Sequence, residues 1–474
     1  MIMNTANSLL IIGAAVLFIL GIRLLSSPKT ARYGNLVAAA GMLVALVSLH
    51  GPDGHFIWTR GWDLNYALII IGILIGLATG AAGAYSVKMT SMPQMVALFN
   101  GLGGGAAALV AGLEFVKGLH MPLAPPWFIA AFMLFATLIG SLSFSGSIIA
   151  YLKLEGKLEK PLTFPGQNLV NSLILVLILG LCGWLAGRDT NPSAAGGFNL
   201  MFILALLFGV AMVMPIGGAD MPVVISLLNS FTGLAVAADG FAIHNLAMVV
   251  AGTLVGSSGT LLTLLMCRAM NRPVSNVLFG AFGSGNTGAS SVTGSAHQAV
   301  KPIQADEAAV LLSYARQVVI VPGYGMAVAQ AQHSVRELSQ ELAQRGVDVR
   351  FAIHPVAGRM PGHMNVLLAE ADVSYELLSE MEAVNPGMEH VDVCLVIGAN
   401  DVVNPAAREE KTSPIYGMPI IEADHAKTVI VMKRSLAAGF AGIENHLFYK
   451  SNTRMLFGDA KASLNALVAQ VRAG

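Results

Sequence analysis

The chain has 474 residues, of which 55% are apolar and only 11% are charged, whereas about a quarter of the residues in soluble domains are charged. Its 27 basic and 27 acidic side chains balance, so no net charge favours binding to nucleic acid. The three cysteines, Cys182, Cys267 and Cys394, form no CxxC pair, which argues against a disulfide framework and a metal site. The composition therefore indicates a membrane protein.

Nine apolar segments precede residue 272, each close to the roughly 20 residues that a helix needs to cross the hydrocarbon core. The first has no basic region before it and no small-residue cleavage site after it, so we expect a membrane helix and not a cleaved signal peptide. The sequence predicts spans at residues 5–25, 33–50, 64–85, 92–115, 126–150, 167–187, 198–216, 221–239 and 242–270. Residues 1–271 are thus expected to form a transmembrane domain of nine helices.

Basic residues are distributed unevenly between the two sides of these spans. One set of alternate loops carries Arg23, Lys29, Arg32, Lys88, Lys153, Lys157, Lys160, Arg268 and Arg272, and the opposite loops carry only Arg60, Lys117 and Arg188. Because cytoplasmic loops are enriched in Lys and Arg, we expect the N-terminus outside and the residues after the ninth span in the cytoplasm. An odd number of spans is needed for this orientation.

Small and polar residues lie inside the spans. The glycines at 101–105 and those at 72, 76, 80 and 83 are expected to let helices pack closely. No titratable side chain falls in the middle third of any span, where the polar residues are Asn100, Ser141, Ser143, Ser145, Asn229, Ser230, Ser257 and Ser258. These either bond a neighbouring helix or hold water along a polar route. Asp220 and Asp239, near the two ends of the eighth span, are either solvated end residues or the mouths of such a route.

The composition changes after the last span. Residues 272–301 are rich in Gly, Ser, Thr, Asn and Ala, which predicts a flexible linker. In residues 302–474, strands are predicted at 317–322, 347–354, 391–397, about 419–421, 428–433 and 453–457, with helices at 304–316 and 459–472. This alternation predicts a Rossmann-like, doubly wound parallel sheet with ligand contacts at the carboxyl ends of its strands.

A glycine turn follows the first predicted strand. The run 318–330 passes from β-branched residues through Gly323-Tyr324-Gly325 into a helix-forming segment, which would bring a pyrophosphate to a helix N-terminus. The third position of this fingerprint is Val328, where Gly or Ala is usual. The second predicted strand ends at His354 without the acid that bonds the adenosine ribose of NAD, which favours NADP.

Other strand ends carry candidate ligand groups. The segment Lys433-Arg434-Ser435 follows the apolar run 428–432, and its two cations either bind a 2′-phosphate or form a solvated charge pair. Arg359 is a second candidate for an anion. Asn400-Asp401 either caps a helix or meets the carboxamide of a nicotinamide.

Together these segments closely resemble the β subunit of proton-translocating NAD(P) transhydrogenases over essentially the whole chain. The resemblance rests on five segments in order: 217–222, 323–330, 354–365, 398–405 and 433–435. It implies an enzyme of the inner (cytoplasmic) membrane whose cytoplasmic domain binds NADP(H). Hydride would come from NADH held by a separate α subunit, while the membrane domain passes a proton inward. The implied partners are that subunit, membrane lipid and a second protomer of the dimeric complex.

The resemblance also implies roles for individual residues. Those expected to contact NADP(H) are Gly323, Tyr324, Gly325, Met326, Ala327 and Val328 along the pyrophosphate, Arg359 near the phosphates, Gly398, Asn400 and Asp401 near the nicotinamide, and Lys433, Arg434 and Ser435 at the 2′-phosphate. Asp220, Asn229 and Asn100 are the residues implied in proton movement. Some family members have a histidine where this chain has Asn100, so a partner subunit is expected to supply a membrane histidine or its equivalent. In the soluble domain, His354 and Asp401 are the suspected sensors of protonation.

Hydride transfer between two nicotinamides needs two dinucleotide sites, and this chain offers one fingerprint. The isolated chain is therefore expected to bind NADP(H) but to lack complete activity. The alternative from another class is a secondary transporter or channel that a nucleotide gates without redox chemistry. A flavin-type membrane reductase is disfavoured, because no haem, iron–sulfur or second nucleotide motif is visible in the sequence.

Overall fold

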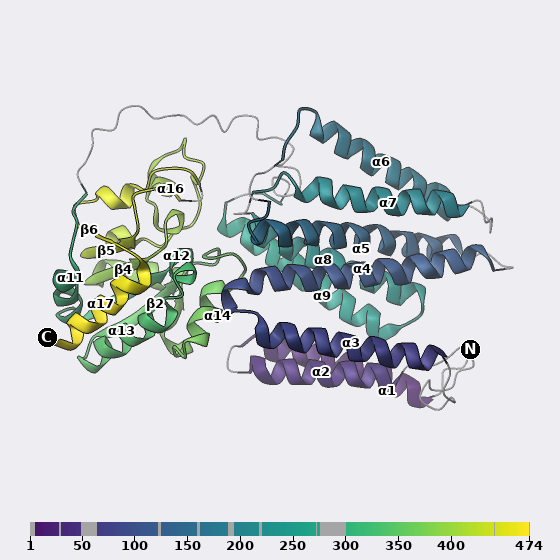
Figure 1. Cartoon of the computed structure of the whole chain (residues 1–474), viewed down its shortest axis with the longest axis horizontal. Coiled ribbons are helices and arrows are strands. Elements are labelled where there is room, and N and C mark those ends of the chain that lie inside the picture. Colours follow the sequence, from purple (N-terminus) through teal and green to yellow (C-terminus); the bar gives the residue numbers. More distant parts are fainter. Residues whose placement is uncertain are drawn as a thin grey trace. The chain divides into compact units, whose positions relative to one another are not determined.

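The computed structural model describes residues 5–27, 30–48, 64–121, 125–158, 162–187, 194–217, 220–271, 273–274, 300–439 and 441–473. The chain forms two compact units, one made of long helices and one built around a sheet, and each is described by itself (Figure 1). The expected linker falls almost entirely outside the described residues, as do five of the basic loop residues: Lys29, Arg60, Lys160, Arg188 and Arg272.

The first unit consists of long apolar helices. They are α1 (Thr5–Leu25), α2 (Ala31–Val47), α3 (Leu64–Ser86), α4 (Met92–Leu119), α5 (Trp127–Leu154), α6 (Gln167–Ala186), α7 (Ala194–Val213), α8 (Met221–Ala242) and α9 (Leu246–Ala269). Eight of the described helices are long and apolar enough to cross a membrane, and α2, with 17 residues, is the shorter ninth. Continuous apolar runs of this length confirm a membrane unit with eight to nine spans.

Glycines bring α4 and α5 into close contact. A Cβ added to Gly140 would lie 2.6 Å from the carbonyl oxygen of Gly104, and one added to Gly101 would lie 3.1 Å from the Cβ of Ser147. The packing role predicted for the 101–105 segment is therefore confirmed. No described atom lies within 4 Å of a Cβ built on Gly72, Gly76 or Gly80 of α3, so the packing role of these glycines stays a prediction.

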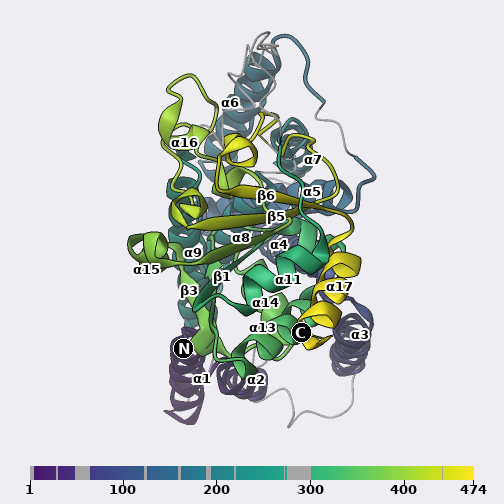
Figure 2. The ribbon, with the colours of Figure 1, turned by 90° about the vertical axis from the view of Figure 1, so that its left-hand side faces the viewer.

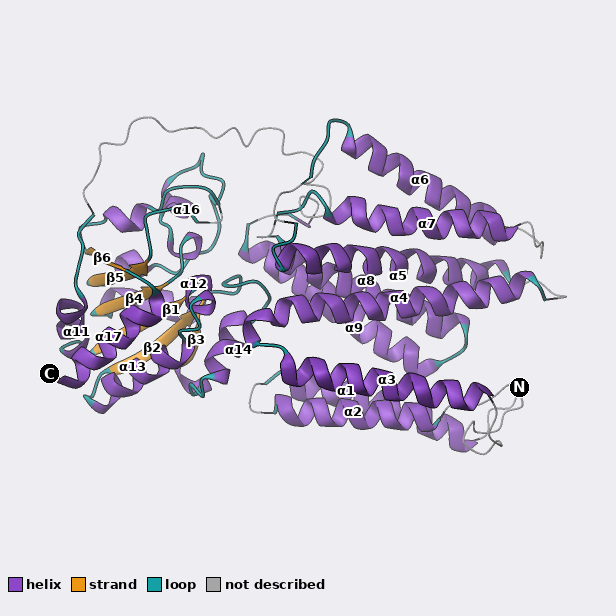
Figure 3. Cartoon of the chain, in the orientation of Figure 1, coloured by secondary structure: helices purple, strands orange, loops and turns teal. Residues whose placement is uncertain are grey.

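The second unit contains a six-stranded parallel sheet, and all of the described strands belong to it (Figure 3). The strands are β1 (Gln317–Pro322), β2 (Asp348–Ile353), β3 (Leu378–Glu380), β4 (Val393–Ile397), β5 (Thr428–Lys433) and β6 (Thr453–Phe457). Their order is β3-β2-β1-β4-β5-β6, and Figure 2 shows β6 beside β5 at one edge. This order and the parallel pairing confirm the Rossmann-like fold.

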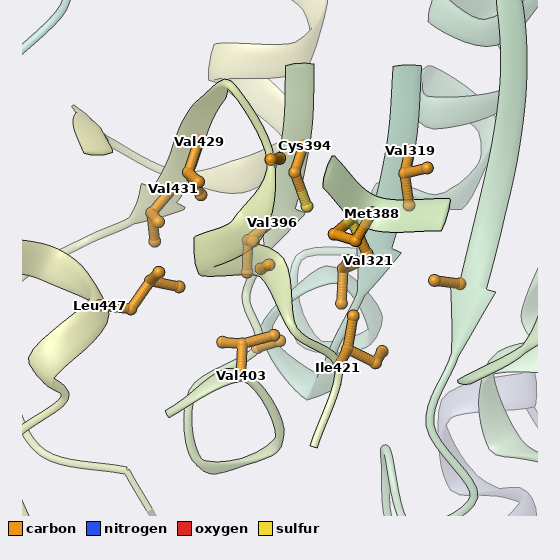
Figure 4. Close-up of a cluster of buried hydrophobic side chains, with 14 of the residues drawn as sticks. Val319, Val321, Met388, Cys394, Val396, Val403, Ile421, Val429, Val431 and Leu447 are labelled. Atoms are coloured by element: carbon orange, nitrogen blue, oxygen red, sulfur yellow. The ribbon is translucent and has the colours of Figure 1, made fainter. Parts of the chain in front are cut away.

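Both faces of the sheet are covered. Figure 4 shows one face, where a buried cluster joins strand residues to the segments that cross them: Val319, Val321, Cys394, Val396, Val429 and Val431 from the strands, and Met388, Val403, Ile421 and Leu447 from the crossing segments. Alternate strand residues point the other way. There α13 (Gln332–Gln344) contacts β2, and α17 (Ala460–Ala473) contacts β5, α13 and α11 (Ala305–Ser313).

Two details of the predicted strands differ from the structure. Residues 419–421 were expected to form a strand but lie in a coil, because Pro419 has no N–H to donate to a ladder and Ile421 bonds the carbonyl of Val402 instead. Strand β3 was not predicted. Its sequence, Leu-Ser-Glu, is short and polar, as befits a strand at the edge of a sheet.

Candidate functional site

The carboxyl ends of β1 and β4 form the centre of the candidate site. The strand order reverses between these two neighbours, which is where doubly wound sheets bind their ligands. The backbone N–H of Gly323 donates to the carbonyl of Ile397 at 2.9 Å, and that of Gly325 donates to the carbonyl of Gly398 at 2.9 Å. A Cβ on Gly398, whose φ is +63°, would lie 2.5 Å from the Cα of Gly325. The two turns thus pack backbone to backbone, and glycine is required at this contact.

The short helix α12 (Tyr324–Val328) begins at this turn. Met326 and Ala327 are buried in the core, so their side chains do not face a ligand. Val328 is 51% exposed, which explains why a branched residue is tolerated at the third fingerprint position. Tyr324 is half-buried, and its ring lies 4.7 Å from the guanidinium carbon of Arg359, which is a cation–π contact. Burial raises the pKa of Tyr324, and the Arg359 charge partly offsets this rise.

The loop after β4 is bonded to the loop after β5. The Asp401 carboxylate accepts a hydrogen bond from the N–H of Ala441 at 2.9 Å, and the buried Asn445 amide donates to the backbone carbonyl of Asn400 at 3.0 Å. Asn404 adds a third link, since its amide donates to the carbonyl of Glu444 at 3.0 Å. The Asn400 side chain makes no helix-capping bond, so the helix-capping alternative is wrong for Asn400.

The structure separates the two cations that follow β5. Lys433 is half-buried: its ammonium group donates to the carbonyl of Ala437, lies 4.9 Å from the centre of the Phe448 ring and is 3.1 Å from the side-chain amide of Asn400. Burial lowers the pKa of Lys433, and the Asp401 carboxylate opposes this shift. Arg434 and Ser435 are exposed. Lys433 therefore lies beside Asn400 of the candidate site, whereas the Arg434 side chain is open to solvent.

Two buried histidines flank the loop that carries Arg359. His354 accepts a hydrogen bond from the N–H of Val356 at its Nδ1 atom (3.3 Å), so its Nε2 atom carries the proton donated to the carbonyl of Pro419 (2.8 Å). Burial lowers the pKa of His354. His363, which the sequence analysis did not single out, accepts the N–H of Arg359 at its Nδ1 atom (3.1 Å). Its position four residues after Arg359, behind a Pro-Gly turn, is the only sequence signal for this contact.

In the helical unit, Asn100 belongs to a buried polar network. Its side chain donates to Ser147 (2.9 Å) and Ser143 (3.4 Å) of α5, and Ser143 bonds Thr232 of α8 (2.6 Å). Thr232 was not predicted. Asn229 is half-buried, and no hydrogen bond among the described residues joins it to this network.

The other polar residues predicted inside the spans differ in their bonding, and the buried hydroxyl of Ser141 has no partner among the described residues. Ser230 bonds the carbonyl of Gly256 on α9 (2.8 Å), as expected for a residue that joins two helices. Ser145, Ser257 and Ser258 bond carbonyls of their own helices. Asp220 is half-buried immediately before α8, about 13 Å along the helix axis from Asn229. The structure therefore joins Asn100 to Ser143 and Thr232 and leaves Asp220 at a distance from them.

A bundle of apolar helices and a Rossmann-like sheet in one chain define a polytopic membrane protein that carries a Rossmann-like domain. The family model described as NAD(P) transhydrogenase beta subunit matches residues 7–470. NAD(P) transhydrogenase subunit beta of Rhodospirillum rubrum, and the same subunit from its strain ATCC 11170, are each 46% identical over 461 residues, covering 96% of this chain and 97% of theirs. The chain belongs to the NAD(P) transhydrogenase beta subunit family.

Proposed function

We propose that the sheet unit binds NADP(H) and that the helical unit translocates protons inward as hydride passes from NADH on an α subunit to NADP⁺. The observation that carries this proposal is the meeting of three features at the carboxyl ends of β1, β4 and β5. These are the Gly323–Gly325 turn, the Asn400–Asp401 pair and Lys433, all in a chain with at least eight described membrane-type helices.

The residues present fit NADP better than NAD. Strand β2 ends at Ile353 and is followed by His354, so the residue at this strand end is not the acid that bonds the ribose of NAD. Lys433 and the exposed Arg434 offer positive charge at the end of β5 for a 2′-phosphate. Arg359, whose guanidinium lies against the Tyr324 ring, would meet another phosphate, and Gly323 to Val328 would follow the pyrophosphate.

When bound, NADP⁺ supplies the nicotinamide ring that accepts the hydride. The chain would orient the nicotinamide. Gly398, Asn400 and Asp401 would line one side of the site, and the hydrogen bonds of Asp401 to Ala441 and of Asn400 to Asn445 hold the 441–445 segment beside them. Protein catalysis of such a transfer consists mostly of orientation and exclusion of water. With one glycine fingerprint in the chain, the NADH site belongs to the α subunit, and two such protomers form the complex.

The membrane part supplies the driving force. A proton that crosses 100 mV releases about 2.3 kcal/mol, which shifts a hydride-transfer equilibrium roughly 40-fold. The coupling requires that the NADP⁺ and NADPH forms favour different states of the proton route, on which we place Asp220, Asn229 and Asn100. The N-terminus lies outside and the sheet unit in the cytoplasm, in agreement with the loop charges that remain described, such as Lys153, Lys157 and Arg268.

The first test is a titration of the full chain, in detergent, with NADP⁺ and NAD⁺ side by side. We expect tighter binding of NADP⁺ and a loss of at least about 100-fold in Lys433→Ala/Arg434→Ala, because each charged hydrogen bond contributes about 1.5–3 kcal/mol. The control is Arg316→Ala, which removes an exposed cation directly before β1, at the amino ends of the parallel strands. Equal binding of the two nucleotides would overturn the 2′-phosphate argument.

The second test reconstitutes the chain with its NAD-binding subunit in vesicles. Reduction of NADP⁺ by NADH together with acidification of one side is the expected result. Binding of NADP⁺ without any reduction would instead favour the nucleotide-gated transporter or channel.

A further inference from the structure

Asp239 is a buried carboxyl near the end of α8. The residue is 1% exposed, and neither of its carboxyl oxygens has a hydrogen-bonding partner among the described residues. Of the two alternatives for this residue, a solvated helix end is therefore wrong. A buried carboxylate without a partner is costly, by several kcal/mol, so the group rests as the neutral acid.

The surroundings of Asp239 are apolar and tightly packed. Its neighbour Ala238 clusters with Ala111 of α4 and Ala136 of α5. On the other side, a Cβ added to Gly240 would lie 2.6 Å from the backbone nitrogen of Val249 on α9. The residues on either side of Asp239 thus pack closely against α4, α5 and α9.

Few charged groups stand at this end of the helices. Glu114 and Lys117 of α4, one turn beyond Ala111, are partly exposed and pair with each other at 2.7 Å. His244 lies in the turn between α8 and α9. Helix α5 has no titratable residue from Trp127 to Ala150, and α9 has none from Leu246 to Met266. Among the described residues of the nine helices, Asp239 is the acid whose two oxygens are both buried and unpartnered.

Asp239 shares a helix face with the polar network described above. Thr232 lies seven residues earlier, which is two helical turns and about 10 Å along the axis. Thr232 bonds Ser143, and Ser143 is bonded by Asn100, but none of these three side chains titrates. Ala235 and Val236 are the residues between Thr232 and Asp239 on this face, so apolar side chains separate the acid from the network.

We propose that Asp239 is a proton-binding residue of the translocation route. Its carboxylate takes a proton from the side of the membrane at which α8 ends, forming an O–H bond, and that bond breaks when the proton leaves toward Thr232, Ser143 and Asn100 along a short chain of water molecules. Only a proton moves, and no electrons are exchanged. This inference rests on the proposed function and adds to the route a buried titratable group of this chain, besides Asp220.

The experiment uses the complete complex in vesicles, with proton movement followed by a pH-sensitive dye and hydride transfer followed by absorbance. Asp239→Asn is expected to reduce proton movement at least 10-fold while NADP⁺ affinity stays within 2-fold. Asp239→Glu, which retains an acid, is expected to restore most of the movement. Glu114→Gln, which removes an exposed and paired acid at the same end of the bundle, is expected to leave it unchanged.

Infrared spectroscopy provides a readout that does not depend on turnover. The carbonyl band of a protonated carboxylic acid is expected in the unaltered complex and in Glu114→Gln, and it should be missing in Asp239→Asn. If the unaltered complex moves no protons, the proposed function itself fails. If it does and Asp239→Asn moves them equally fast, the role of Asp239 is overturned. The proposal is also overturned if both Asp239 variants are inactive and the unaltered complex shows no carboxylic acid band that Asp239→Asn removes. The residue would then have a structural role.

Discussion

The backbone N–H of Arg359 donates to the Nδ1 atom of His363 at 3.1 Å, inside a loop that is too buried to admit a charged imidazole. Burial, with a further contribution from the Arg359 charge, lowers the pKa of His363 from 6.5 to about 4. The unfolded chain therefore binds a proton below pH 6.5 that the folded chain does not bind until about pH 4. The stability contributed by neutral His363 is complete above pH 6.5 and is lost as the pH falls toward 4.

We expect the sheet unit to lose about 2 kcal/mol of stability between pH 7.5 and pH 5 from this group. Hydrogen exchange of the β1 and β4 amides in the full chain measures it, after correction for the intrinsic effect of pH. His363→Asn keeps an acceptor for the Arg359 N–H and removes the titration, so its pH dependence should be flatter. An unchanged slope in that variant would assign the effect to other groups.

Gly398 should be intolerant of a side chain. Gly398→Ala adds a Cβ at a φ of +63° and 2.5 Å from the Cα of Gly325, so it combines backbone strain with overlap. Gly346→Ala is the matched control, because its φ is +84° but no atom lies within 4 Å. We expect about 1 kcal/mol for the control and several kcal/mol for Gly398→Ala in the same exchange measurement. Equal losses would show that the contact between the two turns is not tight.

Asn445 should hold the loop after β5 in place. Asn445→Ala removes the donor to the Asn400 carbonyl and the acceptor for the Leu447 N–H (3.0 Å each), which costs about 1–3 kcal/mol for each buried group left unpaired. Amides 441–447 should therefore exchange at least 10-fold faster. Asn452→Ala breaks two comparable bonds, to the carbonyls of Asp424 and Ala426 at the opposite end of β5, and should leave these amides unaffected.

Lys153 should stabilise the helical unit by capping α7. Its ammonium group donates to the carbonyls of Met214 and Ile216, which follow the last residue of that helix. Lys153→Met removes both bonds and the favourable charge at a helix C-terminus, so we expect a loss of about 1–3 kcal/mol and a lower melting temperature in detergent. Lys157→Met changes an exposed residue of the next turn and serves as control. Similar melting temperatures for the two variants would contradict the capping role.

Sequence patterns predicted the elements whose signal is local and continuous. The membrane helices follow from apolar runs, and five of the six strands follow from β-branched runs, whereas β3 has too few residues to show a pattern. The Gly323 turn and Lys433 could be recognised as strand-end residues. Asn445 and Thr232 could not, because each acts through a partner far away in the sequence that only the folded chain brings near. The contact of His363 with Arg359 is local, but it depends on the course of the Pro-Gly turn between them.

Asp239 shows the same limit in the helical unit. Its position near the end of a span is compatible both with a solvated helix end and with the mouth of a polar route, so the sequence favoured neither. Its neighbours Ala238 and Gly240 pack against α4, α5 and α9, and these contacts depend on how the helices cross.

Cys394 lies on β4 at the centre of the cluster in Figure 4, with no exposed surface. Burial, with a contribution from the Asp424 charge, raises the pKa of its thiol to about 12, so almost no thiolate exists at neutral pH. Alkylating reagents attack thiolates, and they can reach this sulfur only when the sheet opens. In a chain whose two other cysteines are replaced by alanine, the rate of Cys394 labelling therefore reports how often the sheet opens. A bound nucleotide should lower this rate.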